Sequence, residues 1–461
     1  MKLIYSLILV LLLTGAASLV AQPITLHPEN PHYFLFRGKP TVLVTSGEHY
    51  GAVMNLDFNY DTYLETIAAD GLNLTRLFSG VYVEGWGEPW NTLNPPHGRY
   101  IAPWARSETP GYSDGGNKFD LTRWDPAYFE RLKDFVRKAG ERGIVVEMVL
   151  FCVYYNDDNW RLSPLNAASN VNGIGNTDRF APYDETDPDL MRVQEAFTRK
   201  IVSELKEFDN VYFELLNEPY ADQGPQVNDS WNDRIIAAIR AETKDHLIAL
   251  NVANDSARVD AINPEVGILN FHYAFPPNAV TMNYDHPRVI SDDETGFDGG
   301  HDESYRKEAW AFMLAGGGAY SNLDWSFTVD SPEGTSEAVP DDLGGGSPTL
   351  RKQLGHLKRF LDGFDFIRMR PDNGIFKGGL SEDVQAWALA EEGRAYAIYV
   401  HGGDQVNLRV TLPEGNYRVE WLDTKSGEYT PAETLTHPGG DATLTSPPYD
   451  TDVALSIKRV E

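Results

Sequence analysis

Glu218 stands where a carboxylate has little structural reason to be. Residues 211–216 are mostly apolar, β-branched or aromatic, which predicts a short buried strand, and this strand runs directly into Asn217 and Glu218. Pro219 then ends the strand, because proline has no N–H to give to a sheet ladder. Strands usually end in turn-forming residues, so the sequence predicts an acid presented at the mouth of a sheet, where parallel α/β folds carry their chemistry.

A second glutamate, Glu294, has a similar setting. It follows the predicted strand 288–291 and ends the acidic run Asp292, Asp293, Glu294. Cleavage of a glycosidic bond needs one acid to protonate the leaving oxygen and a second carboxylate to attack the anomeric carbon or activate water. We therefore predict that Glu218 and Glu294 are the catalytic pair of a glycoside hydrolase. Whether Asp292 or Asp293 shares the role of Glu294 stays open at this stage.

Eight strand-like segments, centred near residues 42, 75, 147, 213, 249, 268, 289 and 321, position these acids. Helical patterns separate most of them, and two of the helices open with Asp-Pro, at 125–126 and 187–188. This alternation predicts an α/β fold, a (β/α)8 TIM barrel, with the two glutamates at the ends of strands four and seven. The connections after strands five and six show little helical pattern.

From residue 375 the pattern changes to segments of period two separated by turn-forming residues, which predicts a small all-β sandwich. The predicted organisation is a signal peptide over residues 1–21, a catalytic barrel over 22–362, a linker over 363–374 and the β-sandwich over 375–461. Trp387 and Trp421 both lie within predicted strands, so the sandwich is interpreted as a packing module rather than a carbohydrate-binding one.

The chain of 461 residues carries a formal net charge of −29, which disfavours nucleic acid and anionic membranes as partners. The N-terminus has the order of a secretory signal: a basic residue, Lys2, then the apolar run 3–13, then small residues before Gln22. We therefore expect export to the periplasm or the extracellular space without membrane insertion. The single cysteine, Cys152, excludes an internal disulfide and is expected to be a small buried residue. The oligomeric state is not defined by the sequence.

Residues 213–219, Phe-Glu-Leu-Leu-Asn-Glu-Pro, resemble the strand-four motif of clan A glycoside hydrolases, of which family 5 is the best known. The resemblance covers roughly residues 24–362 and implies that Glu218 is the acid/base and Glu294, within Glu-Thr-Gly, the nucleophile of a retaining enzyme. It implies a plant- or microbe-derived oligo- or polysaccharide substrate and no cofactor. The C-terminal sandwich is similar to the β domains that follow barrels of the apiosidase-like group.

The same resemblance assigns substrate-binding roles around the two glutamates. Arg76 would support the nucleophile, Asn217 would bind the sugar 2-hydroxyl and Trp325 would form the floor of the sugar subsite. Further candidates for substrate binding are His49, Trp86 and the strand-six pair His272 and Tyr273, whose tyrosine would bond the nucleophile. Glu214 lies four residues before Glu218, so its side chain is expected on the same face of the strand, toward the barrel interior. It is expected to pair with Arg76, because a buried carboxylate needs a partner.

Two other functions compete with hydrolysis by paired glutamates. A metal-dependent barrel hydrolase would need His-x-His at the first strand, which Glu48-His49 does not provide, so no metal is predicted. A catalytically inactive carbohydrate-binding barrel would bind glycans without turnover. The tryptophans of the two long loops are either core residues or platforms for sugar rings, and they are Trp86, Trp90, Trp104, Trp124 and Trp160.

Overall fold

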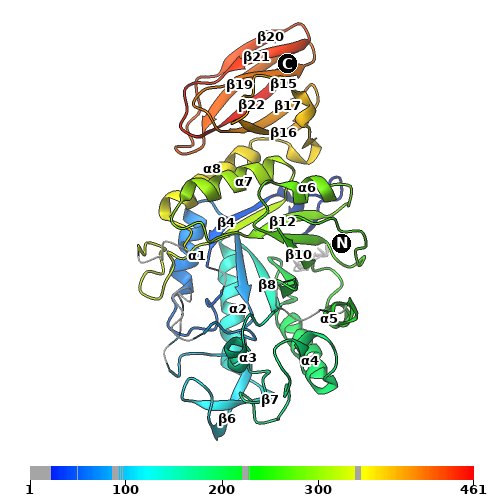
Figure 1. Cartoon of the computed structure of the whole chain (residues 1–461), viewed down its shortest axis with the longest axis vertical. Helices are drawn as coiled ribbons and strands as arrows, with labels where there is room; N and C mark the ends of the chain where they lie inside the picture. Colours follow the sequence, from blue (N-terminus) through cyan, green and yellow to red (C-terminus); the bar gives the residue numbers. More distant parts are fainter. Residues whose placement is uncertain are drawn as a thin grey trace, which may run out of the picture.

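The protein forms an eight-stranded parallel sheet rolled into a near-closed barrel, followed by antiparallel sheets at the C-terminal end (Figure 1). This computed structural model describes residues 22–48, 50–85, 93, 95, 97–220, 227, 229–337 and 344–460. The predicted fold class is confirmed. The predicted signal peptide, residues 1–21, lies outside the described residues, so its assignment stays a prediction.

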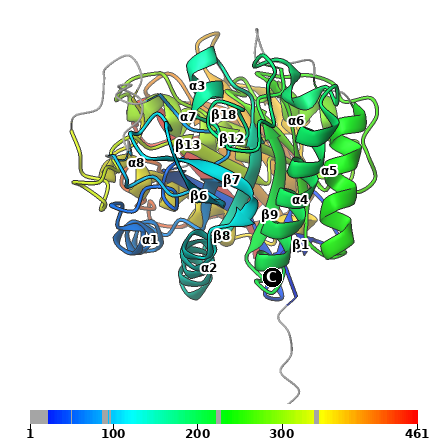
Figure 2. The ribbon, with the colours of Figure 1, turned by 90° about the horizontal axis from the view of Figure 1, so that it is seen from below.

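The barrel is built from alternating strands and helices. Its strands in chain order are β4 (Leu43–Gly47), β5 (Leu74–Phe78), β8 (Val145–Cys152), β9 (Val211–Asn217), β10 (Ile248–Asn254), β11 (Ile268–His272), β12 (Val289–Glu294) and β13 (Ala319–Leu323). The helices between and after them are α1 (Tyr60–Ala69), α2 (Pro126–Glu141), α4 (Pro188–Leu205), α5 (Asp229–Glu242), α6 (Asn278–Asn283), α7 (Asp302–Leu314) and α8 (Pro348–Asp362). Helices α1, α2, α4 and α5 lie on the outside of the sheet (Figure 2).

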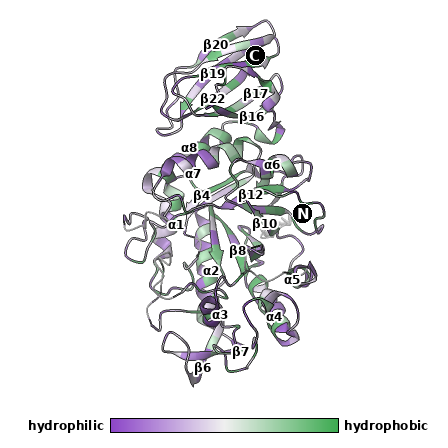
Figure 3. Cartoon of the chain, in the orientation of Figure 1, coloured by the Kyte–Doolittle hydropathy of each residue, from purple (hydrophilic) through white to green (hydrophobic). Residues whose placement is uncertain are grey.

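The helices form where the sequence predicts them because their ends are capped and one face is apolar. Asp125 and Asp187 accept hydrogen bonds from the first-turn N–H groups of α2 and α4, and a proline follows each of them. Both helices carry hydrophobic as well as hydrophilic residues, and the hydrophobic ones are buried (Figure 3). As the sequence indicated, residues 255–267 contain no helix, and the six-residue α6 alone separates β11 from β12.

Two stretches that the sequence predicts as long loops contain regular structure. The loop after β5 holds an antiparallel hairpin of β6 (Trp104–Pro110) and β7 (Asn117–Trp124), and the loop after β8 holds the short helix α3 (Asp157–Leu162). The register of the hairpin shifts twice, between Trp104 and Arg106 and between Arg106 and Pro110. Such shifts break the period-two alternation on which strand prediction depends, so the hairpin was missed.

An apolar layer seals the amino-terminal end of the barrel. Each barrel strand contributes one buried side chain to it, namely Leu43, Leu74, Val145, Tyr212, Ala249, Ile268, Val289 and Ala319. Phe34 and Phe36 of β2 (Phe34–Phe36) pack against this layer from a small sheet completed by β1 (Thr25–Leu26) and β3 (Lys39–Thr41). Chemistry is therefore confined to the opposite, carboxyl-terminal end of the barrel.

The barrel is joined between β4 and β5 by isolated bonds, chiefly those of Asn73, rather than by a ladder. The sheet order is β4-β13-β12-β11-β10-β9-β8-β5, which leaves β4 and β5 at its two ends. Asn73 connects them: its N–H donates to the Val44 carbonyl at 3.2 Å, its Oδ1 accepts from the Val44 N–H at 2.9 Å, and its Nδ2 donates to the Val42 carbonyl at 2.9 Å.

The C-terminal part consists of two antiparallel sheets with a shared apolar core. One sheet contains β14 (Arg370–Pro371), β16 (Gln385–Glu391), β17 (Ala395–His401), β22 (Asp452–Val460), β19 (Gly415–Asp423) and β20 (Glu433–His437). The other contains β15 (Phe376–Gly378), β18 (Asn407–Leu412) and β21 (Gly440–Thr445). Strand β14 comes from the segment that the sequence predicts as a linker, so part of that segment belongs to the sandwich sheet.

The sandwich packs directly on the barrel helices α7 and α8 (Figure 1). Trp310 of α7 stacks on Tyr399 of β17 with ring centroids 5.5 Å apart. Beside them, Arg306 donates to both carboxylate oxygens of Asp452, at 2.7 and 2.9 Å, and Tyr399 donates to Asp452 at 3.0 Å. Arg306 and Asp452 are only 2% and 3% exposed, so the two parts share one continuous buried interface.

Candidate active site

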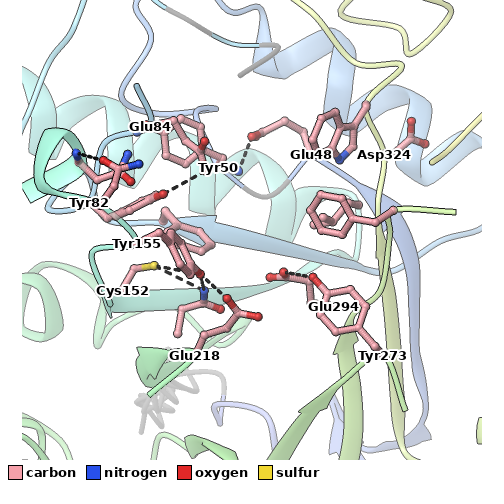
Figure 4. A pocket seen from close by; sticks show the side chains of 17 residues that line it. Glu48, Tyr50, Tyr82, Glu84, Cys152, Tyr155, Glu218, Tyr273, Glu294 and Asp324 are labelled. Carbon is pink, nitrogen blue, oxygen red and sulfur yellow. Dashed lines mark hydrogen bonds between the residues drawn. The ribbon is translucent and has the colours of Figure 1, made fainter. Parts of the chain in front are cut away.

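A pocket of about 370 Å³ opens at the carboxyl ends of the barrel strands, and both predicted catalytic glutamates line it (Figure 4). Glu218 follows β9 directly and has a backbone φ of 51°, a left-handed conformation that costs a non-glycine residue energy. Tyr273, which follows β11, has a φ of 53°. Strain of this kind collects at functional sites, where the surrounding fold holds a side chain in place.

Glu294 is held by two donors from different strands. Arg76 of β5 donates through Nη1 to its Oε2 at 2.5 Å, and the Tyr273 hydroxyl donates to its Oε1 at 3.0 Å (Figure 4). The residue is 6% exposed, and the guanidinium and the phenol together fix the orientation of its carboxyl group. A carboxyl group that is held on both oxygens and reaches the pocket has the geometry of a nucleophile.

Glu218 is also held on both oxygens. His272 contacts Oε1 through Nδ1 at 3.2 Å, and the Tyr155 hydroxyl donates to Oε2. Asn251 holds the histidine ring from the other side: its Nδ2 donates to Glu214 at 3.0 Å and lies 2.6 Å from His272 Nε2, so that Nδ1 faces Glu218. Burial raises the pKa of Glu218, but the bonds and charges of His272, Tyr155 and Arg76 outweigh burial and lower the pKa below its usual value.

The two carboxylates lie close together. Oxygen atoms of Glu218 and Glu294, together with a ring nitrogen of His272, all lie within 4.8 Å of one another. Carboxyl groups about 5–5.5 Å apart are typical of retaining glycosidases, whereas inverting enzymes hold them about 6.5–9.5 Å apart to admit a water.

Below the pocket, Arg76 lies among buried carboxylates. It donates through Nη2 to Glu214 at 2.7 Å, which is the predicted pair, and its Nε lies 3.1 Å from Asp293. Burial raises the pKa of Asp293 well above its usual range, although Arg76 opposes this, and burial raises the pKa of Glu147 to about 7. The single positive charge of Arg76 cannot neutralise the four carboxyl groups around it, those of Glu147, Glu214, Asp293 and Glu294, in an interior without water. Some of these carboxyl groups must therefore carry a proton.

A bulge in β12 separates the three consecutive acids. Phe271 of β11 pairs with Asp292, while the next residue, His272, pairs with Glu294, so Asp293 is an extra residue on β12. Asp292 is fully buried near Glu308 of α7, and Asp293 points at Arg76 inside the barrel. Of the three, Glu294 alone lines the pocket.

The other predicted site residues divide into three groups. Asn217, Tyr273 and Trp325 line the pocket, and Arg76 and His272 lie directly beneath it in contact with the two glutamates. His49 and Trp86 lie outside the described residues, so their roles stay predictions. The loop tryptophans Trp104, Trp124 and Trp160 do not line the pocket: Trp104 stacks on Trp124 at 5.7 Å, and Trp160 is buried against Tyr154. Trp104 and Trp160 are thus core residues, the half-buried Trp124 packs on Trp104, and Trp90 lies outside the described residues.

Sequence reasoning missed several polar residues of the pocket wall, among them Glu48, Asp324 and Tyr155. Glu48, after β4, accepts from the backbone N–H groups of residues 50–52, and its burial raises its pKa to about 7. Asp324, after β13, pairs with Arg351 at 2.6 Å, and Tyr155 lies three residues after β8. Glu48 and Asp324 could have been found from the sequence, because each comes directly after a barrel strand, which is the criterion that identified Glu218.

The clustered donors do not form a free metal site. Glu218, His272 and Glu294 are close enough to share an ion, as are Glu214, His272 and Asp293. However, Arg76 and Tyr273 bond Glu294 of the first group, and Arg76 bonds Glu214 of the second, while Asn251 contacts the His272 that both share. The described part of the chain therefore offers the arrangement of an acid–base pair rather than the open set of ligands of a catalytic metal.

A TIM barrel with paired carboxylates on strands four and seven is the architecture of a glycosidase. The family model "Cellulase (glycosyl hydrolase family 5)" matches residues 36–294. The chain belongs to glycoside hydrolase family 5, which acts on glycans, and it is a glycosidase.

Three solved structures of similar fold match between 74% and 95% of this chain. A family 5 glycoside hydrolase from Bacteroides vulgatus is 14% identical, with a TM-score of 0.65 over 95% of this chain and 93% of its own. A second structure, described as a glycoside hydrolase, is 15% identical, with a TM-score of 0.66 over 95% of this chain and 97% of its own. An endo-1,4-β-mannanase from Rhizomucor miehei is 12% identical, with a TM-score of 0.50 over 74% of this chain and 100% of its own.

The search of curated proteins by sequence gave no significant match. Within the described ranges, every helix is too short or too polar to cross a membrane.

Proposed function

We propose that the protein hydrolyses O-glycosidic bonds with retention of anomeric configuration, with Glu294 as nucleophile and Glu218 as acid/base. The observation that carries this proposal is the short separation between the carboxylates of Glu218 and Glu294, within 4.8 Å. The distinct partners of the two glutamates support the division of roles. Glu294 is paired with a guanidinium, whereas Glu218 bonds an imidazole and a phenol.

The reaction starts from the form of the enzyme in which Glu218 holds a proton, which is the minor form at neutral pH because the pKa of Glu218 is lowered. In the first half, a Glu294 oxygen attacks the anomeric carbon while Glu218 gives this proton to the leaving oxygen, so the glycosidic bond breaks as the glycosyl–enzyme ester forms. In the second half, Glu218 removes a proton from water, the water attacks the anomeric carbon and Glu294 leaves as a carboxylate. Tyr273 and Arg76 hold Glu294 in line for both steps. Asn217 and Trp325 provide a hydrogen-bonding group and a flat apolar surface for the sugar.

The configuration of the first product tests this proposal. A β-linked aryl glycoside or oligosaccharide is incubated with the protein, and the anomeric proton of the released sugar is followed by NMR before mutarotation. The expected first product is the β-anomer, because two displacements restore the configuration. Release of the α-anomer would refute retention, and binding without release would favour the catalytically inactive carbohydrate-binding barrel.

The charge of the pocket favours an uncharged glycan as substrate. Five carboxylates line it, namely Glu48, Glu84, Glu218, Glu294 and Asp324, and the described lining residues include no Lys, Arg or His. An anionic sugar would be repelled by these side chains and by the net charge of −29. The proposed substrate is therefore a neutral plant- or microbe-derived oligo- or polysaccharide.

Matched substrates check this selectivity. Aryl β-glycosides of neutral hexoses are compared with the corresponding aryl β-uronides, which differ by one carboxylate. We expect kcat/KM to be at least about 10-fold lower for each uronide, since like charges in a buried site cost more than about 1.4 kcal/mol. Equal or faster hydrolysis of the uronide would contradict the assignment of a neutral substrate.

We further propose that the protein is exported after removal of residues 1–21. The basis is the basic, apolar and small-residue order of this segment. In a bacterial expression host, the N-terminus of the chain recovered from the periplasm or the medium is expected to lie near Gln22. Retention of Met1 on cytoplasmic protein would contradict export.

A further inference from the structure

Tyr155 occupies a position beside Glu218 that no sequence motif indicates. It follows β8, lines the pocket and is 39% exposed, although it is a large aromatic residue. Its hydroxyl donates to Glu218 Oε2, and its ring meets the ring of Tyr82 nearly at a right angle with centroids 5.8 Å apart. In Figure 4, Tyr155 lies between Cys152 and Glu218 with its hydroxyl directed toward the glutamate.

A chain of hydrogen bonds fixes the direction of the Tyr155 O–H group. Arg76 Nη2 donates to Asn217 Oδ1 at 2.6 Å, so the Nδ2 end of the Asn217 amide is the end that faces Tyr155. Asn217 Nδ2 donates to the Tyr155 oxygen at 3.0 Å. Because the phenol oxygen accepts there, its own proton points to Glu218. The relay connects Arg76, which holds the nucleophile, with the acid/base on the other side of the pocket.

We propose that Tyr155 is a positioning residue that orients Glu218 and stabilises its carboxylate form, and so sets the pH at which the acid catalyst loses its proton. This inference rests on the proposed role of Glu218 as acid/base. A carboxylate gains more than a carboxylic acid from an O–H donor, so the bond lowers the affinity of Glu218 for a proton. The same bond keeps the side chain from turning away from the sugar before a substrate arrives.

Other groups face Glu218 from every element around it, and they stay in place when the Tyr155 hydroxyl is removed. The groups that can be charged are His272 on β11, Arg76 on β5 and Glu294 on β12. The neutral ones are the Cys152 thiol and the Tyr220 and Tyr273 phenols, whose pKa values are raised by burial, so that they do not ionise near neutral pH. A shift in the titration of Glu218 on removal of this one hydroxyl can therefore be assigned to Tyr155.

Tyr155→Phe tests the proposal because it removes the donor and keeps the ring. The measurement is kcat/KM against pH on a substrate whose leaving group needs protonation. Loss of activity at high pH reports the acid of the free enzyme, and this limb is expected to move upward by about one to two pH units, the effect of one hydrogen bond to a charged group. An unchanged limb in a variant with wild-type thermal stability would overturn the proposal.

Tyr154→Phe is the matched control. Tyr154 precedes Tyr155, is buried and bonds Ser163 at 2.9 Å, away from Glu218, so its loss should leave the limb in place. If Tyr155→Phe fails to fold, 3-fluorotyrosine at position 155 keeps the shape and strengthens the donor. The limb should then move to lower pH, and no movement would count against the proposal.

Glu218→Gln separates failure of this inference from failure of the proposed function. If Glu218→Gln abolishes turnover of poor leaving groups and Tyr155→Phe leaves the limb unchanged, only the role of Tyr155 is refuted. If Glu218→Gln keeps the wild-type pH profile, the assignment of the acid/base itself is wrong.

Discussion

Glu294→Ala should lower hydrolysis of an activated aryl glycoside by on the order of 10⁴–10⁶-fold, the scale seen when a covalent nucleophile is removed. The variant should still fold, because Arg76 keeps its bonds to Glu214 and Asn217. Sodium azide should restore part of the rate, since it can enter the vacated space and attack the anomeric carbon. The glycosyl azide formed should have inverted configuration, because a single displacement then replaces two.

Glu218→Ala is the matched comparison, and its azide product should differ. With an activated leaving group that needs no proton, the glycosyl–enzyme still forms on Glu294, and azide then attacks it. The product should retain configuration, and the loss of rate on unactivated substrates should be about 10²–10⁴-fold, the usual contribution of an acid catalyst. If both variants gave the same anomer of the azide, or if Glu294→Ala kept full activity, the assignment of roles would be wrong.

Asp452→Ala should destabilise the whole chain by about 3–5 kcal/mol, the cost of leaving a buried charge without its partner. Arg306 would lose the bidentate carboxylate that neutralises it, and Tyr399 would lose its acceptor. Trp310 and Tyr399 stack next to this pair, so disorder there would reach α7 as well as β17. Thermal unfolding followed by fluorescence and by activity should show both signals shifting together to lower temperature.

Two controls define this effect. The double variant Arg306→Met and Asp452→Leu replaces both charges by apolar groups and should recover much of the loss. Asp441→Ala removes a surface partner of Arg409, with side chains 35% and 54% exposed, and should change stability by less than about 1 kcal/mol. The opposite result would be a separate fluorescence transition that moves to lower temperature while the temperature of inactivation stays unchanged. The sandwich would then unfold independently of the barrel, which would contradict this prediction.

The fold and the place of Glu218 at the end of strand four could be predicted because their signals are local. Strand period, the helix caps at Asp125 and Asp187, and Pro219 after Glu218 are each read from a few consecutive residues. Whether Asp292 and Asp293 also reach the pocket beside Glu294 could not be predicted in this way. It depends on a bulge in the pairing of β11 with β12, which arises from two strands together and leaves no pattern in either one.

The loops mark the other limit of prediction. Trp104 and Trp124 are tryptophans in loops at the catalytic end of the barrel, as expected of residues that stack on sugar rings. In the structure they stack on each other across a hairpin whose strands the sequence pattern does not predict. No sequence motif identifies Tyr155. Its proposed role depends on a hydrogen bond from the side-chain amide of Asn217, which lies at the end of β9. Loop side chains take their direction from contacts distant in sequence, so their roles needed the three-dimensional structure.

The junction between β4 and β5, at Asn73, is the place where we expect the barrel to deform most easily. Seven neighbouring strand pairs are tied by main-chain ladders, whereas β4 and β5 are linked only by isolated bonds of Asn73 and of the Tyr63 hydroxyl within the described residues. Glu48 follows β4 and Phe78 ends β5, and both form part of the pocket wall. Slow breathing of the cylinder should therefore concentrate at this seam, where two sides of the sugar-binding wall can separate slightly without breaking a ladder.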